Sequence, residues 1–307
     1  MEASPTRTAR QSETLRTGWT RPTLPAGYWA PLGAVTIWSM NSIVTKQAAT
    51  AINPASIALY RWLLALLILT PFLARPVWRR RSAVAAHWPK LAVLGGLGMA
   101  TYQGLAYQAA LTTSATDMGV ILALMPLVSA LLAAALAGEP MQARRILGGA
   151  VSLAGLVIMT TRGHPSSLLR GAATGDVLML VAVIANSLYG VLLKRWEIPL
   201  TTWQQIYIQA AFGALFLLPF WLWGEKAPIT QANAGLILFA AVAASLGAPY
   251  LWITSVKQIG AARSALFVNL LPPLVALMAW ITWGEALTLP QLIGGAIALI
   301  GVRIGLR

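Results

Sequence analysis

The sequence predicts an all-α integral membrane protein of ten transmembrane helices, arranged as two five-helix repeats of inverted orientation. The first observation is composition: of 307 residues, 58% are hydrophobic and 10% are charged, whereas soluble domains carry about 25% charged residues. The second is that apolar runs continue for about 20 residues, the length of helix that crosses a bilayer. They do not alternate with period two, as strands of a membrane barrel do, and a helix pairs its own backbone groups inside lipid. The third is a pattern that recurs in both halves of the chain.

The ends of the expected spans carry local signals. Asn53 followed by Pro54 is typical of a helix N-cap with proline in the first turn. Gly138 and Gly284 each end an apolar run directly before a glutamate. Tryptophans gather near many of the ends, as interfacial anchors do. The ten expected spans cover residues 27–47, 54–74, 90–111, 116–137, 144–161, 174–194, 203–223, 234–256, 262–283 and 288–306.

Basic residues are distributed unevenly between the two sides of the expected bundle. Of the 22 Lys and Arg residues, 17 fall on the side of the N-terminus, one (Arg61) lies within a span, and the other side holds Lys46, Arg162, Arg170 and Lys226. Cytosolic connections are enriched in Lys and Arg, so we expect both termini in the cytosol and residues 1–26 as a disordered cytosolic tail. Because the net charge of +14 is spread over many short connections, we expect no nucleic-acid partner.

The two halves share a motif in register. The residues Pro126, Gly138-Glu139, Gly148-Gly149 and Gly155 recur 146 residues later as Pro272, Gly284-Glu285, Gly294-Gly295 and Gly301. An odd number of spans in each copy makes the second copy enter the membrane from the opposite side. The expected repeats are residues 27–161 and 174–306. Inverted repeats are a common construction of secondary transporters, because two such halves can open toward opposite faces in turn.

This repeated Pro, Gly-Glu, Gly-Gly pattern resembles the drug/metabolite transporter superfamily, and within it the ten-helix EamA-type exporters. The segment Ala-Leu-Thr-Thr-Ser-Ala at residues 110–115 adds to the likeness, which covers nearly the whole chain from about residue 30 in both copies. Within that family the chain is similar to bacterial exporters of aromatic amino acids or of threonine and homoserine. The resemblance implies a bacterial inner-membrane location. It also implies a central cavity walled by spans one, three, four, six, eight and nine, with spans five and ten to the side.

Polar side chains at membrane depth are candidates for lining that cavity, because polar groups there are costly and usually face protein or water. Trp38, Asn41, Ser42 and Thr45 are spaced to share one face of the first span. The alternative is that such groups only hold helices together. The candidate substrate-binding residues are Trp38, Asn41, Ser42, Tyr102, Gln103, Tyr107, Asn186, Tyr189, Tyr250, Trp252 and Asn269.

Prolines and glycines mark places where helices could bend. Pro126 and the pair Pro272-Pro273 remove backbone donors within the fourth and ninth spans, so we predict them as gating positions. Gly95, Gly96, Gly98 and Gly104 weaken the third span, although glycine also serves close packing between membrane helices.

The predicted function is a secondary transporter that exports amino acids, with apolar or aromatic ones favoured, or related small metabolites by alternating access. A zwitterion carries no net charge and can be held by amides, hydroxyls and helix ends. Only Arg61 lies clearly within a span, so a phosphate carrier, which needs several basic groups, is disfavoured. Arg61 itself lies near the outer end of its span. We expect it to snorkel, to pair with a helix C-terminus or to meet a substrate carboxylate.

Other classes remain as alternatives or are disfavoured. An exporter of drugs or other metabolites, a channel and a non-transporting subunit stay open, as do the coupling ion and the oligomeric state. An enzyme is disfavoured, because no span contains a histidine and the nucleophile and ATP-binding loop motifs are absent. With no cysteine and two histidines in connections, we expect no metal and no cofactor.

Overall fold

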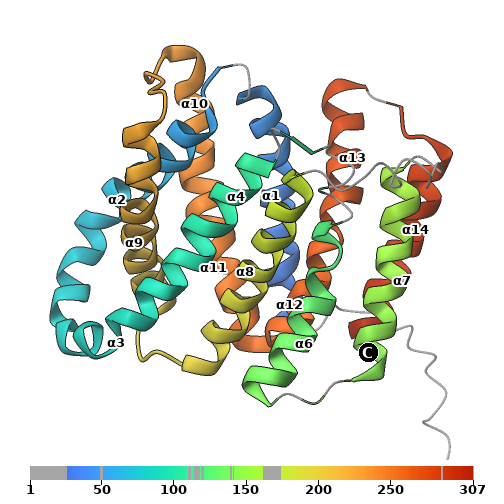
Figure 1. Ribbon diagram of the computed structural model, residues 1–307, viewed down its shortest axis with the longest axis horizontal. Coiled ribbons are helices and arrows are strands. Elements are labelled where there is room, and N and C mark those ends of the chain that lie inside the picture. The colour runs from blue at the N-terminus through green and yellow to red at the C-terminus, as the bar shows by residue number, and fades with distance from the viewer. Residues whose placement is uncertain are drawn as a thin grey trace, which may run out of the picture.

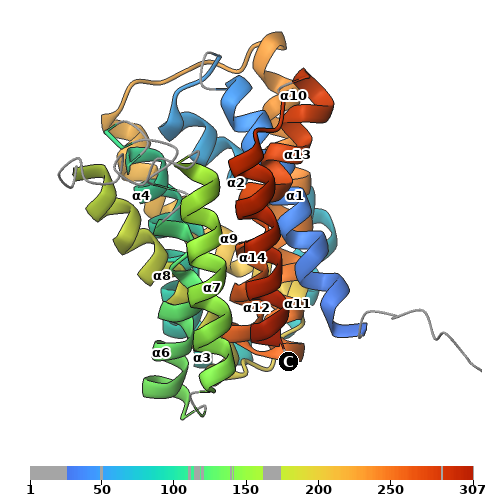
Figure 2. The ribbon, with the colours of Figure 1, turned by 90° about the vertical axis from the view of Figure 1, so that its right-hand side faces the viewer.

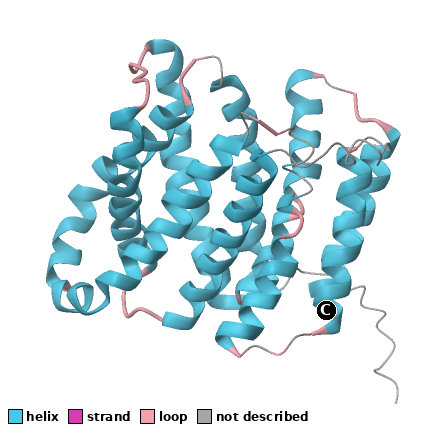
Figure 3. Ribbon diagram, in the orientation of Figure 1, coloured by secondary structure: helices cyan, strands magenta, loops and turns pink. Residues whose placement is uncertain are grey.

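The structure is a computed structural model that describes residues 26–48, 51–109, 112–113, 118, 121–138, 140, 142–161, 174–284 and 286–306. Every regular element in these ranges is a helix (Figure 3). The predictions for residues 1–25 and for the connection at 162–173 lie outside the described residues.

The helices of the first half follow the order of the expected spans. After a short 3₁₀ turn, η1 (Ala26–Tyr28), they are α1 (Trp29–Ala48), α2 (Pro54–Arg79), α3 (Arg81–Leu94), η2 (Gly95–Thr101), α4 (Tyr102–Ala109), α6 (Met125–Ala137) and α7 (Ala143–Thr160).

The helices of the second half are α8 (Thr174–Trp196), α9 (Thr202–Trp223), α10 (Gln231–Phe239), η4 (Ala240–Gly247), α11 (Ala248–Ile259), α12 (Ala261–Val268), α13 (Leu271–Trp283) and α14 (Leu289–Leu306). The series α3–η2–α4 and α10–η4–α11 are each continuous, and α12 leads into α13, so the described helices join into ten units. Six of them are long and apolar enough to cross a membrane.

The units stand side by side in one bundle (Figures 1 and 2). The connections α2–α3, α6–α7, α8–α9 and α11–α12 lie at its lower edge in Figure 1, near the C-terminus, and the connections α9–α10 and α13–α14 lie at its upper edge. Successive units therefore alternate in direction, as membrane spans do.

The prediction of a non-helical connection at residues 75–89 is wrong. Residues 75–79 and 81–89 are helical, and Arg80 alone separates α2 from α3. The expected boundaries relied on the change from apolar to basic residues. Long arginine side chains reach water from a helix at the membrane surface, so the charges do not end the helix. The Nε2 amide of Gln204 on α9 donates to the carbonyl of Pro76 at 3.4 Å, which ties this extension to the bundle.

Irregular backbone occurs at matching places in the two halves. The π-helical segments η2 and η4 interrupt the third unit of each half. The fourth units break at residues 123–124 and 269–270, and new helices begin there with Pro126 and with Pro272-Pro273 in their first turns. In membrane proteins, broken helices are typical of segments that line a cavity.

The glycines of η2 are in close packing. A Cβ on Gly95 would lie 2.6 Å from the carbonyl oxygen of Gln209 on α9, and a Cβ on Gly98 would lie 2.9 Å from the ring of Tyr189 on α8. Close helix contact therefore requires glycine at both positions.

The helices α7 and α14 lie antiparallel at one end of the bundle (Figures 1 and 2). Their contact is made of glycine on both sides. A Cβ on Gly148 would lie 2.6 Å from the carbonyl oxygen of Gly301, and a Cβ on Gly155 would lie 2.5 Å from the carbonyl oxygen of Gly294. The two backbones touch directly, as in small-residue contacts between membrane helices.

Candidate functional site

An aromatic pair joins α1 to α11 in the middle of the bundle. The ring centroids of Trp38 and Trp252 are 5.4 Å apart, with an angle of 54° between the planes. Trp252 is buried and Trp38 is half-buried. The indole Nε1 of Trp252 is buried with no hydrogen-bond partner among the described residues. The structure therefore brings these two predicted residues into contact.

The rest of the polar stripe on α1 is only partly buried. Asn41 is half-buried, and Ser42 is exposed and donates to the carbonyl of Trp38 at 3.1 Å. The side chain of Thr45 lies outside the described part of the chain. Among these, Trp38 and Asn41 face the bundle most clearly.

The predicted pair on α8 makes contacts in two directions. The Nδ2 of Asn186 lies 3.5 Å from the sulfur of Met125, next to the break in the fourth unit. The hydroxyl of Tyr189 donates to Oε1 of Gln209 on α9 at 3.1 Å. Their spacing of three residues predicts one shared helix face, but Asn186 contacts α6 and Tyr189 contacts α9.

On the third unit, Tyr102 and Gln103 follow the π-helical segment directly. Tyr102 is half-buried against the core. Gln103 is also half-buried, and its Oε1 is buried without a partner among the described residues. The side chain of Tyr107 lies outside the described residues.

Tyr250 and Asn269 have packing partners on other helices. Tyr250 stacks on Trp203 of α9 with ring centroids 4.6 Å apart. The Nδ2 of Asn269 donates to Oγ of Ser152 on α7 at 2.9 Å, and Asn269 is 1% exposed. Their roles in binding stay predictions.

Of the three alternatives considered for Arg61, snorkelling is wrong, because the side chain is buried inside the bundle. Its side chain is 3% exposed, its Nε donates to Oγ of Ser245 at 2.5 Å, and its guanidinium lies 5.6 Å from the ring of Trp62. Ser245 belongs to η4, so the hydroxyl and the indole offer Arg61 partners inside the bundle. The signal available in the sequence was an ionisable residue inside a span, which indicates a functional site by itself.

Arg61 and the tryptophan pair contact the same continuous helix. Ser245, bound to Arg61, and Trp252, packed on Trp38, are seven residues apart along η4 and α11. Seven residues of helix span about 10 Å. The residues that contact Arg61 and Trp38 thus lie about two turns apart along this helix.

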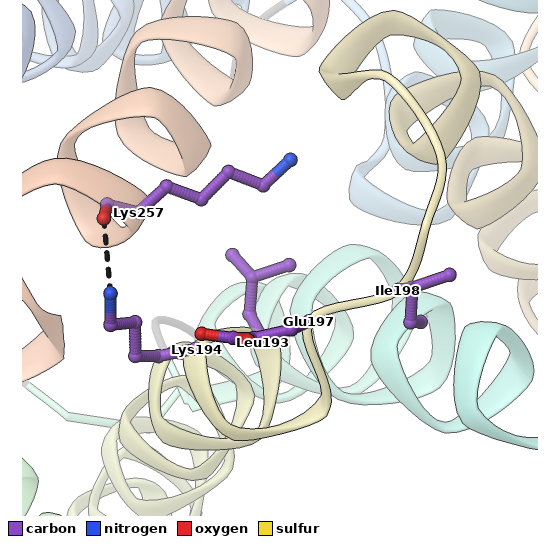
Figure 4. A pocket seen from close by; sticks show the side chains of 5 residues that line it. All are labelled: Leu193, Lys194, Glu197, Ile198 and Lys257. Atoms are coloured by element: carbon purple, nitrogen blue, oxygen red, sulfur yellow. Dashed lines mark hydrogen bonds between the residues drawn. The ribbon is translucent and has the colours of Figure 1, made fainter.

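A pocket of about 240 Å³ opens at the lower edge between the ends of α8 and α11, lined by Leu193, Lys194, Glu197, Ile198 and Lys257 (Figure 4). The Nζ of Lys194 donates to the carbonyl of Lys257 at 3.1 Å, and the Nζ of Lys257 donates to Oγ1 of Thr202 at 3.3 Å. A lysine bound to a carbonyl in the last turn of a helix satisfies an otherwise unpaired acceptor. These contacts join α8, α9 and α11 at this edge.

The opposite edge is held by contacts between the two halves. Nδ2 of Asn53 donates to the carbonyl of Glu225 at 2.6 Å, and the hydroxyl of Tyr60 donates to the carbonyl of Ala227 at 2.9 Å. Asn233 on α10 donates to the carbonyl of Ala51 at 3.3 Å. The connection after α1 is thereby bound to the connection after α9.

The length and apolar surface of the described helices are those of a multi-pass helical membrane protein. The model of the EamA-like transporter family matches residues 25–161 and again residues 173–306. The chain belongs to the EamA-like transporter family, within the drug/metabolite transporter superfamily, and the predicted resemblance is confirmed.

Individual relatives agree with this membership. The chain is 25% identical to the uncharacterized transporter YyaM of Bacillus subtilis (strain 168), covering 84% of this chain and 86% of the relative. It is 25% identical to a probable terminal-alkyne amino-acid exporter of Streptantibioticus cattleyicolor, over 92% and 93% of the two chains. A solved crystal structure at 20% identity superposes with a TM-score of 0.73 over 91% of this chain and 95% of that one, and so has the same fold.

Proposed function

We propose that this chain exports amino acids or similar small metabolites across the bacterial inner membrane by alternating access, with both termini in the cytosol. Membership of a transporter family supports movement of a small molecule. The likeness to a probable amino-acid exporter supports the substrate class.

The observation that carries the proposal is the buried Arg61. A guanidinium binds a carboxylate through paired, charge-assisted hydrogen bonds. In our proposal Arg61 holds the substrate carboxylate, and Trp38 with Trp252 contacts an apolar or aromatic side chain. The separation of about 10 Å along η4 and α11 suits a molecule with a carboxylate at one end and an apolar group at the other.

The remaining candidate residues complete the proposed cavity. Asn41, Gln103 and Asn186 are half-buried amides that suit the substrate ammonium and carboxylate. Broken helices near Pro126 and Pro272 suit a place where the two halves change their relative position.

The proposed repeats, residues 27–161 and 174–306, are related by a two-fold axis in the membrane plane. The reciprocal contacts of α7 and α14 support this relation. The positions Gly148 and Gly155 correspond to Gly294 and Gly301, and an axis that exchanges the halves turns the contact between Gly148 and Gly301 into one between Gly294 and Gly155. Both contacts are present, and such self-complementarity is typical of two-fold interfaces.

The test is counterflow of labelled phenylalanine in liposomes that contain the purified protein. We expect exchange with unlabelled phenylalanine and weaker exchange with phenylalaninamide, which has no carboxylate. Because a hydrogen bond to a charged group contributes about 1.5–3 kcal/mol, Arg61→Gln should lower kcat/KM for phenylalanine by roughly tenfold or more and remove the preference over phenylalaninamide.

The matched control is Arg303→Gln, because Arg303 is exposed near the end of α14. This variant should transport as the parent does. Exchange of an organic cation or a drug with no exchange of any amino acid would overturn the proposed substrate. If Arg61→Gln still prefers phenylalanine over phenylalaninamide, Arg61 does not bind the substrate carboxylate.

A further inference from the structure

The corner between α2 and α3 lies at the lower left of the bundle in Figure 1. The 26 residues of α2 correspond to a length of about 39 Å, which exceeds the hydrocarbon thickness of about 30 Å. Even at a tilt of about 30° a helix of this length exceeds the hydrocarbon thickness, so we expect its last turns, from about Ala74 onward, at the level of the lipid headgroups.

The corner carries a concentrated positive charge. Its exposed basic side chains are Arg75, Arg79, Arg80 and Arg81. The sequence has no Asp or Glu between Glu13 and Asp117. No carboxylate on α2 or α3 can thus neutralise this cluster.

An exposed tryptophan lies among these arginines. Trp78 is 69% exposed, and the guanidinium of Arg81 lies 5.7 Å from its ring. A shallow, open hollow of about 380 Å³ on the surface of α2 is lined by Ala74, Arg75, Trp78 and Arg79. Arg75 and Arg79 are four residues apart and so lie on the same face of the helix, with the indole beside them.

We infer that this hollow binds the phosphate headgroup of an anionic phospholipid. Arg75 and Arg79 donate to the phosphate oxygens, and Trp78 and Ala74 contact the first methylenes of the acyl chains. Basic clusters next to a membrane span attract anionic lipid, and tryptophan favours the same depth.

This site differs from the general pattern of basic residues that orients a protein in the membrane. Orientation depends on the number of basic residues in short connections and needs neither a hollow nor an aromatic side chain. Arg195 and Arg303 are exposed basic residues at the ends of α8 and α14, and neither lines this hollow. Replacing Arg195 and Arg303 is therefore a matched control for the loss of two positive charges.

The experiment is native mass spectrometry of the full-length protein in a neutral detergent, with added phosphatidylglycerol, phosphatidylcholine or inorganic phosphate. We expect phosphatidylglycerol to bind and the other two to bind weakly. The double variant Arg75→Gln/Arg79→Gln should bind phosphatidylglycerol roughly thirtyfold more weakly, since each basic residue near an anionic surface contributes a factor of about five. Arg195→Gln/Arg303→Gln should bind as the parent does.

Three results would overturn the inference. One is equal loss in both double variants, which indicates a general charge effect. Another is equal binding of phosphatidylcholine, which shows no headgroup recognition, and a third is binding of inorganic phosphate as tight as that of the lipid. The variant Trp78→Ala provides a second test with the arginines intact, and we expect weaker binding there too. Unchanged binding would exclude the indole from the site. None of these outcomes depends on transport.

Discussion

Replacing Gly155 with alanine adds one methyl group where the backbones of α7 and α14 touch. The new Cβ would lie 2.5 Å from the amide nitrogen of Ala298 and 2.5 Å from the carbonyl oxygen of Gly294. Favourable contacts between such atoms need about 3.5–4.0 Å. Because backbone atoms cannot rotate away as a side chain does, the two helices must separate by about 1 Å.

The cost follows from the kind of contact. Adding a methylene to a close-packed interior costs about 1–3 kcal/mol. Moving α7 and α14 apart also weakens the dispersion attraction along their whole contact. Alanine is itself favoured over glycine within a helix by about 0.8–1.0 kcal/mol. We therefore expect Gly155→Ala to destabilise the protein by about 1–2 kcal/mol net. Gly301→Ala, the corresponding position of the second half, should act similarly.

The assay is thermal unfolding of the purified protein in one detergent, followed by intrinsic tryptophan fluorescence. Gly235→Ala is the matched control, because Gly235 is exposed within α10 and an added Cβ meets no atom within 4 Å. The control should unfold at the parent temperature or slightly above it, and Gly155→Ala should unfold several degrees lower. Equal unfolding temperatures for the two variants would refute the proposed backbone contact between α7 and α14.

Further predictions concern the proposed cavity and the topology. Trp38→Ala or Trp252→Ala should lower efflux of phenylalanine more than efflux of threonine, because the rings contact the apolar side chain; equal losses would assign them to folding alone. In this cysteine-free chain, Asn41→Cys and Asn186→Cys should react with a small water-soluble thiol reagent, and protection of both in every transport condition would contradict a cavity at these positions. A phosphatase reporter fused after Arg307 should be inactive, because the expected C-terminus is cytosolic, and periplasmic activity would reverse the orientation.

The helices were largely predictable because the membrane sets a local requirement. A run of about 20 apolar residues is needed to cross the bilayer, and a helix pairs its backbone without help from distant residues. The expected span 203–223 differs by one residue from α9 (Thr202–Trp223). Gly138 and Gly284 end their helices as predicted, and both do so in the left-handed conformation, with φ of 66° and 67°.

The candidate site was less predictable, since its residues acquire partners from distant helices. Trp38 and Trp252, both predicted to line one cavity, pack against each other, and their role in substrate binding stays a prediction. The spacing of Asn186 and Tyr189 predicted one shared helix face, but the packing of α6 and α9 gives each of them a different helix as its partner.

The membrane class, the order of the spans and the family could be predicted from the sequence. The length of the apolar runs and the motif repeated in both halves are read directly from the chain. The burial of Arg61 could be seen only in the tertiary structure. Its distance from the end of α2 suited snorkelling, and the hydroxyl of Ser245, 184 residues away in sequence, binds it in the interior. Tertiary structure likewise decided that α2 and α3 meet at Arg80. The physical reason is that lipid requires only an apolar helix surface, so which helices meet, and which polar groups they bring together, depends on packing between segments far apart in the chain.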